Sequence, residues 1–374
     1  MKPATRFNCI EISLIRQMNA MAKPSTINLG IGEPNVEPDV ELLSMARAAA
    51  TGDWHYSPNA GNLSLRELVA ARHGGTYNPR NEVCVTAGTM EALYAIAQAF
   101  VDPGDEVLVP DPGFLAYPAI ATLAGATPVP YPLLPGSWDV DLDALRRLVT
   151  PRTKMIVVNT PSNPTGAILC EKTLRAIAAL GDEHDIVVVA DEVYSEVFYE
   201  TRPPSMSGMG RNVVVVDGMS KSHVMTGLRL GWILAGTELM ATIYKSHQYI
   251  ATCASVFAQQ LAERILASSE WNAGWLVRMR AQFATQRDAL FTALRDDLGL
   301  ALPPPAGAFY AFFAIPSADS LALATKAATE AGVLVIPGIA FGVHGEGYLR
   351  VSYASDVATI REGVRRLAPI VRGA

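Results

Sequence analysis

Short apolar runs alternate with longer helical patterns over the first two thirds of the chain. The runs predict strands at residues 83–86, 106–110, 155–159, 186–190, 213–217 and 231–235. Several are continuously apolar, as strands buried on both faces of a mainly parallel sheet are. Between them, residues 89–101 and 171–184 carry apolar side chains along one helical face. This alternation is typical of an open α/β sheet built from βαβ units.

Polar residues follow four of the predicted strands at the carboxyl end. They are Gly88 with Thr89, Asn163, Asp191 with Tyr194, and Ser220 with Lys221. Ligands of open α/β sheets bind outside the carboxyl ends of the strands. We therefore expect these side chains to gather at one place.

The pattern changes after about residue 240. Long helices are expected at 241–266 and 271–298, and the three prolines at 303–305 follow. A strand at 309–314, a helix at 321–331 and strands at 333–336 and 348–352 complete the chain. We expect a large domain over residues 40–270, and a smaller α+β domain formed by residues 1–39 and 271–374.

Composition narrows the possible functions. The chain has 374 residues, half of them hydrophobic, and a net charge of −6 without a cluster of Lys and Arg. A nucleic-acid partner, which needs a basic face, is not expected. The four cysteines are far apart and read as mostly buried, reduced thiols. Without a signal peptide or a long apolar segment, we expect a cytoplasmic protein that does not contact membranes.

Lys221 is a candidate nucleophile. A lone lysine is usually a solvated surface charge, but Lys221 comes soon after a run of four valines at 213–216. Desolvation at the end of a buried strand lowers the pKa of an amine from about 10.4 and makes it nucleophilic toward carbonyls. Such a lysine can form a Schiff base.

Asp191 follows the apolar run at 186–190, so its carboxylate should emerge from the interior of the sheet. It could be a helix N-cap or half of a structural ion pair. Alternatively, it could keep a ring nitrogen protonated, as the electron-sink chemistry of pyridoxal phosphate requires. Tyr194 would lie on the same face if a helical turn follows. Asn163 sits in an Asn-Pro turn and offers an amide to the same cleft.

A strand, a glycine and a helix start meet at Gly88, Thr89 and Met90, which is typical of a phosphate site. Many α/β proteins have this arrangement without a ligand. Phe114 either packs in the core or stacks on a flat ring. Arg350 lies in a predicted strand, where burial is costly without an anion, so it binds either a substrate carboxylate or a structural carboxylate. Arg229 likewise binds either a ligand anion or a structural carboxylate, and a cofactor phosphate is its expected anion.

Taken together, these residues resemble the class I/II aminotransferases of pyridoxal-phosphate fold type I. The resemblance runs from INLGIGEP at 27–34 to PGIAFGVHGEGYLRVSYA at 337–354. Its most specific parts are NPTG at 163–166, DEVY at 191–194 and the lysine segment GMSKSHVMTGLRLGW at 218–232.

The resemblance implies a seven-stranded, mainly parallel sheet flanked by helices, with a smaller α+β domain. It also implies transfer of an amino group from an L-amino acid to a 2-oxo acid on pyridoxal 5'-phosphate, through internal aldimine, external aldimine and ketimine or pyridoxamine phosphate. The enzyme would be a homodimer with shared active sites. The six histidines show no metal-ligand spacing, so no metal is expected.

The resemblance also implies residue roles. Lys221, Asp191 and Tyr194 would be catalytic: Lys221 would carry the internal aldimine and shuttle a proton, Asp191 would pair with the pyridinium, and Tyr194 would contact the ring oxygen. The remaining cofactor contacts would come from Gly88, Thr89, Met90, Phe114, Asn163, Ser220, Arg229 and, from the partner subunit, Tyr56. The substrate carboxylate would be held by Arg350, with Gly32 and Asn163 nearby.

Two positions depart from many relatives. Gly218 stands where a serine is often found, so one hydroxyl contact fewer is expected, and Phe114 replaces Tyr or Trp. A dehydrogenase is disfavoured because the third glycine of its fingerprint is missing after GIGEPN. A transcription regulator is disfavoured because no residues are left for a DNA-binding domain. A carbon–sulfur β-lyase on the same scaffold stays open, as does the identity of the donor, whose side chain we expect near residues 10–16.

Overall fold

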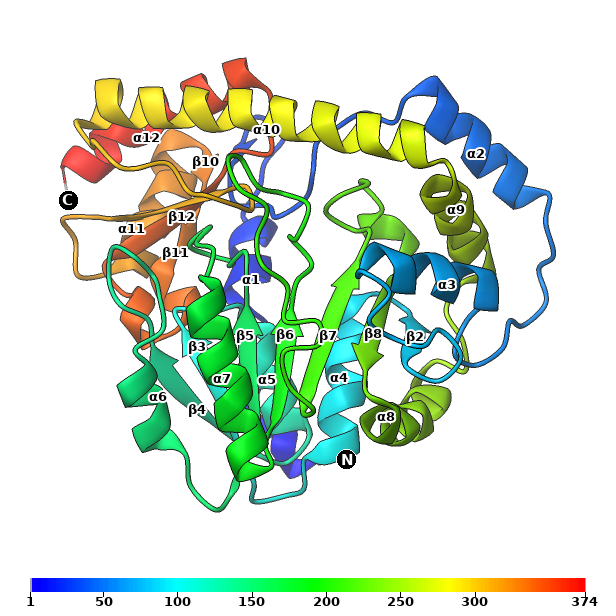
Figure 1. The fold of residues 1–374 in the computed structure, drawn as a ribbon. Helices are drawn as coiled ribbons and strands as arrows, with labels where there is room; N and C mark the ends of the chain where they lie inside the picture. The colour runs from blue at the N-terminus through cyan, green and yellow to red at the C-terminus, as the bar shows by residue number, and fades with distance from the viewer. Residues whose placement is uncertain (1, 374) are drawn as a thin grey trace.

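The computed structural model describes residues 2–373 and is built around one central sheet (Figure 1). The sheet has seven strands in the order β2-β8-β7-β6-β5-β3-β4. All are parallel except β8, which runs antiparallel to both β2 and β7. The strands are β2 Val83–Thr86, β3 Glu106–Asp111, β4 Thr127–Pro132, β5 Thr153–Asn159, β6 Val187–Asp191, β7 Val213–Gly218 and β8 Gly231–Ala235. The predicted fold class is confirmed.

Helices cover both faces of this sheet because its central strands are apolar on both sides. In β7, Val214 and Val216 pack with the helices α4, α5 and α8, while Val213 and Val215 pack with α3 and α7 on the other face. These helices are α3 Leu63–Arg72, α4 Thr89–Phe100, α5 Ala116–Leu123, α7 Glu171–His184 and α8 Thr237–Ile250. The remaining helix of this region, α6, spans Leu142–Leu148.

The sequence pattern missed the edge strand β4. Its sequence, TPVPYP, has a proline at every second position. Proline cannot donate to a sheet ladder, and it is tolerated where that side of the strand has no partner. In the part of the chain that the structure describes, β4 pairs with β3 alone, so its other edge can accommodate the prolines.

The C-terminal part of the chain forms smaller sheets beside the central one, under the long helix α10 (Figure 1). Strands β11, β12 and β9 make an antiparallel sheet, and β1 near the N-terminus pairs with β10. The elements are α1 Leu14–Ala20, β1 Ile27–Asn28, α2 Val40–Ala50, α9 Val256–Ala267, α10 Ser269–Leu298, β9 Tyr310–Ala314, α11 Ser320–Lys326, β10 Val333–Leu334, β11 Ile336–Pro337, β12 Tyr348–Ser352 and α12 Val357–Arg372. Division of the chain at residues 40 and 270 stays a prediction.

Three expectations from the sequence need correction. The helix expected at 241–266 is broken at residues 251–255, where Thr252 has a φ of 63° and Ser255 caps α9. The helix expected at 321–331 ends in a π-helical turn before Gly332. Of the cysteines expected to be mostly buried, Cys9 and Cys170 are exposed. Among residues 2–373, no helix has the length and apolar character needed to cross a membrane.

Candidate active site

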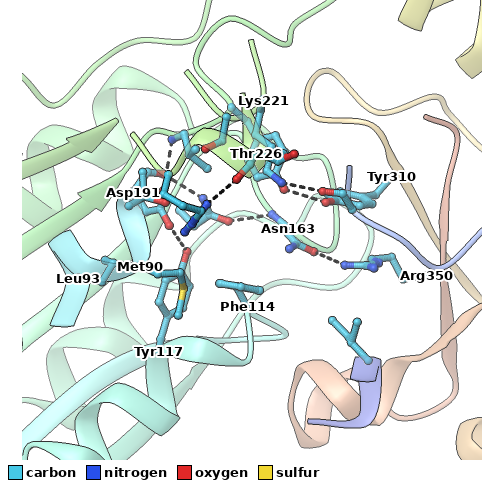
Figure 2. Close-up of a pocket in the computed structure, with 18 residues that line it drawn as sticks. Met90, Leu93, Phe114, Tyr117, Asn163, Asp191, Lys221, Thr226, Tyr310 and Arg350 are labelled. Atoms are coloured by element: carbon cyan, nitrogen blue, oxygen red, sulfur yellow. Dashed lines mark hydrogen bonds between the residues drawn. The ribbon is translucent and has the colours of Figure 1, made fainter. Parts of the chain in front are cut away.

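A cavity of about 260 Å³ opens at the carboxyl ends of β5, β6 and β7, facing the start of α4 and the smaller sheet (Figure 2). Parallel strands place the residues that follow them at the same edge, which is why segments far apart in sequence meet here. The lining residues are Ile15, Gly32, Thr89, Met90, Leu93, Phe114, Tyr117, Asn159, Asn163, Asp191, Val193, Tyr194, Ser220, Lys221, Thr226, Arg229, Tyr310 and Arg350.

All residues expected at the site line this cavity except Gly88 and Tyr56. Gly88 is the N-cap of α4, directly before Thr89. Tyr56 is 86% exposed and lies in a separate surface hollow with Trp54 and Phe257. Within one subunit, Tyr56 therefore does not reach the cavity.

The start of α4 forms a cationic cradle with Arg229. The first N–H groups of a helix have no intrahelical acceptor, so those of Thr89 and Met90 can bind an anion. Gly88 has a φ of 85°, and a Cβ at this position would lie 2.8 Å from Nη2 of Arg229. Glycine therefore permits the close approach of the guanidinium. Arg229 forms no ion pair within residues 2–373.

Gly218, which stands where relatives often have a serine, lies beside this cradle. A Cβ there would meet the carbonyl oxygen of Leu230 at 2.9 Å and Cα of Gly231 at 3.0 Å. Both atoms belong to the neighbouring backbone, which cannot move aside as a flexible side chain could. The close approach of the two strands accounts for glycine at this position.

Lys221 projects into the cavity three residues after β7. Its Nζ donates a hydrogen bond of 2.6 Å to the carbonyl oxygen of Gly32. Burial lowers the pKa of Lys221 to about 8, although the nearby Glu33 opposes this shift. A lysine with such a pKa is partly neutral near physiological pH and is a competent nucleophile.

Asp191, the last residue of β6, is 4% exposed and faces Lys221 across the cavity (Figure 2). Its carboxylate accepts hydrogen bonds from the hydroxyl of Tyr117 at 2.8 Å and from the backbone N–H of Val193 at 3.2 Å. Burial raises the pKa of Asp191 to about 6. Among residues 2–373 this carboxylate forms no ion pair, so a cationic ligand would compensate its burial.

Arg350 lies at the opposite end of the cavity, and only 1% of its surface is exposed. Its Nη1 donates to Oδ1 of Asn163 at 2.9 Å, and its Nη2 donates to the carbonyl oxygen of Gly30. Its Nε has no hydrogen-bond partner in the described part of the chain. The guanidinium lies 4.4 Å from the ring centre of Tyr310. A buried guanidinium without an anion is costly, and a ligand carboxylate would offset this cost.

The sequence pattern missed Tyr117 and Tyr310. Tyr117 lies three residues after Phe114, and this helical spacing could have indicated it. Tyr310 holds the hydroxyl of Tyr194 at 2.7 Å. No local signal distinguishes Tyr310 from the other aromatic residues of β9.

Comparison with known proteins gives a consistent result. The family model described as "Aminotransferase class I and II" matches residues 24–367. The chain is 34% identical to the aromatic-amino-acid aminotransferase 2 of Thermococcus litoralis, over 98% of this chain and 97% of that relative. It is 34% identical to the aspartate aminotransferase of Pyrococcus abyssi, over 100% and 99% of the two chains. Among solved structures, it is similar to the aspartate aminotransferase of Thermus thermophilus in complex with maleate. The TM-score is 0.93 and the identity 31%, over 99% of this chain and 100% of that one.

Proposed function

The chain belongs to the class I and II aminotransferases, and we propose that the cavity between Asp191 and Arg350 is its active site. As a member of this family it is a pyridoxal-phosphate-dependent enzyme that transfers amino groups between amino acids and 2-oxo acids. One observation carries the site assignment. A buried carboxylate and a buried guanidinium, neither in an ion pair within residues 2–373, face a lysine of lowered pKa across one cavity.

The residues of the cavity fit pyridoxal phosphate. Asp191 would hold the protonated ring nitrogen, and Phe114 would stack on the ring. The start of α4 at Thr89, together with Ser220 and Arg229, would bind the phosphate. The buried carboxylate of Asp191 suits a cationic group, and the guanidinium of Arg229 close to Gly88 suits an anionic one. Together they match a ligand that is cationic at one end and anionic at the other.

The cofactor, when bound, supplies an electron sink for the negative charge that develops at the substrate Cα. Lys221 would hold the cofactor through its carbonyl carbon and, once the substrate amine has displaced it, its free amine would take the proton from the substrate Cα. Asp191 would keep the ring nitrogen charged, and Tyr194 with Asn163 would contact the ring oxygen. Arg350 would hold the substrate carboxylate bidentately and so fix which Cα bond faces Lys221.

We also propose a homodimer in which Tyr56 reaches the cofactor phosphate of the partner subunit. Its support is the exposure of Trp54 at 77%, Tyr56 at 86% and Tyr249 at 87%, since large aromatic side chains gather on interaction surfaces. Tyr56→Ala and Lys221→Ala proteins should each lose activity, and their mixture should regain it in hybrid dimers that contain one complete site. A mixture without recovery would refute the shared site.

The cavity wall supports a donor with an uncharged side chain. Its cationic lining residues are Lys221, Arg229 and Arg350, and each already has a proposed partner. Ile15 of α1 adds an apolar surface, in the segment where side-chain specificity was expected. We therefore propose a higher kcat/KM for leucine or phenylalanine than for aspartate. A preference for aspartate would require a cation from the partner subunit.

A visible spectrum of the purified protein, recorded during addition of single amino acids, tests the reaction. Transamination predicts loss of the cofactor band and release of the matching 2-oxo acid. Ammonia and pyruvate from a cysteine-like substrate would instead establish a β-lyase.

We also propose a cytoplasmic location, which the four cysteines without a disulfide support.

A further inference from the structure

A partly buried chain of hydrogen bonds lies beside the start of α4, outside the cavity. The backbone N–H of Ala87 donates to Oε2 of Glu91 at 3.0 Å. The other oxygen of Glu91 lies 3.0 Å from Nδ1 of His247 in α8. Nε2 of His247 lies 2.9 Å from the backbone carbonyl oxygen of Asn59. Three segments distant in sequence are therefore joined through one imidazole.

The geometry favours a charged imidazole. A neutral imidazole has a single N–H, yet both ring nitrogens of His247 face acceptors, a carboxylate and a carbonyl oxygen. The side chain of His247 is fully buried and that of Glu91 is 8% exposed. Burial opposes the charge, but the neighbouring carboxylate of Glu91 favours it, and the pKa of His247 is raised.

Glu91 departs from the usual capping pattern of a helix. A glutamate at the third helical position commonly bonds the N–H of the N-cap residue. Here the N-cap is Gly88, whose N–H already donates to the carbonyl oxygen of Thr86 at 2.8 Å. Glu91 instead bonds Ala87, one residue earlier, and so fixes the turn that leads into α4.

We propose that Glu91 and His247 are positioning residues for the cofactor phosphate. The pair would hold the turn at Ala87 and Gly88 so that the N–H groups of Thr89 and Met90 converge on the phosphate. Through Asn59, the same imidazolium would anchor the loop that carries Tyr56. This inference rests on the phosphate cradle proposed above.

The test compares the dissociation constants of pyridoxal phosphate and of pyridoxal, which lacks the phosphate. Glu91→Ala should weaken binding of pyridoxal phosphate by about tenfold or more, because a hydrogen bond to a charged group is lost, and should leave pyridoxal within about twofold. Glu91→Gln should retain most of the affinity, since its amide can accept from Ala87 and donate to a neutral His247. Glu171→Ala is the matched control, because Glu171 lies in the first turn of α7, which packs on the opposite face of the sheet from α4.

Two histidine variants decide the matter if Glu91→Ala does not fold. The amide nitrogen of asparagine takes the place of Nδ1, and that of glutamine the place of Nε2. His247→Asn, which keeps the bond to Glu91, should therefore bind pyridoxal phosphate more tightly than His247→Gln. Equal binding by the two variants, or an equal loss for pyridoxal and its phosphate, would overturn the proposal.

Arg229→Gln separates this inference from the proposed cradle. If it selectively weakens pyridoxal phosphate while the Glu91 variants do not, the cradle stands and the positioning role is wrong. If no variant distinguishes the two ligands, the phosphate site itself is misplaced.

Discussion

Replacement of Arg350 by methionine is the sharpest test of the active site. The side chain is 1% exposed and makes two hydrogen bonds, to Asn163 and Gly30, but no ion pair within residues 2–373. If it binds the substrate carboxylate, the variant breaks a buried ion pair, which costs about 3–5 kcal/mol. At about 1.4 kcal/mol per factor of ten, kcat/KM should fall roughly 10²- to 10⁴-fold.

The assay is the single-turnover half reaction, measured with an amino acid and with the corresponding amine that lacks the carboxylate. Only the amino acid should lose its rate, and the dissociation constant of the cofactor should change little. Arg287→Met is the matched control, because Arg287 stacks on Tyr199 at 4.3 Å much as Arg350 stacks on Tyr310 at 4.4 Å, but does not line the cavity. An equal loss for the amine and the amino acid would refute the carboxylate role.

The same variant should not destabilise the apoprotein. A methionine in place of a buried guanidinium without an anion removes its desolvation cost, which offsets the loss of the two hydrogen bonds to Asn163 and Gly30. Urea unfolding of the two apoproteins measures this difference. A large loss of stability would show that Arg350 serves the fold instead of the ligand.

Three further variants test the other end of the cavity. Lys221→Ala should abolish the covalent attachment of pyridoxal phosphate, seen as loss of the borohydride-reduced adduct by mass spectrometry, while the far-ultraviolet spectrum is retained; a persisting adduct would exclude Lys221. Burial raises the pKa of Asp191 from 3.8 to about 6, so between these pH values the unfolded apoprotein binds fewer protons than the folded one. The free energy of unfolding of the apoprotein should therefore fall as pH rises through this window. Asp191→Asn should remove that fall of about 3 kcal/mol, at 1.36 kcal/mol per pKa unit, in urea titrations at the two ends of the window; an unchanged slope would contradict the assignment. Gly88→Ala should weaken pyridoxal phosphate binding by about tenfold, because φ is 85° and the added methyl would displace Arg229, whereas unchanged affinity would place the phosphate elsewhere.

Much of the central sheet could be predicted from the chain because its strands are buried on both faces. The valines of β7 and the apolar runs of β5 and β6 identify themselves without reference to other segments. Strand β4 escaped because its prolines contradict strand propensity, and only its position at the edge of the sheet permits them. The break between α8 and α9 was not predicted because both helices are amphipathic, so the sequence pattern is helical on each side of it.

By itself, the sequence determined which residues follow the buried strands and therefore face the ligand edge of the sheet. Lys221, Asp191 and Asn163 could be chosen on that ground, because the carboxyl ends of parallel strands lie at one edge of a sheet. Only the tertiary structure decided their partners. Tyr117 bonds Asp191 from α5 and Arg350 bonds Asn163 from β12, contacts between segments separated by 74 and 187 residues. Such contacts depend on how the elements pack, and no periodicity along the chain records them.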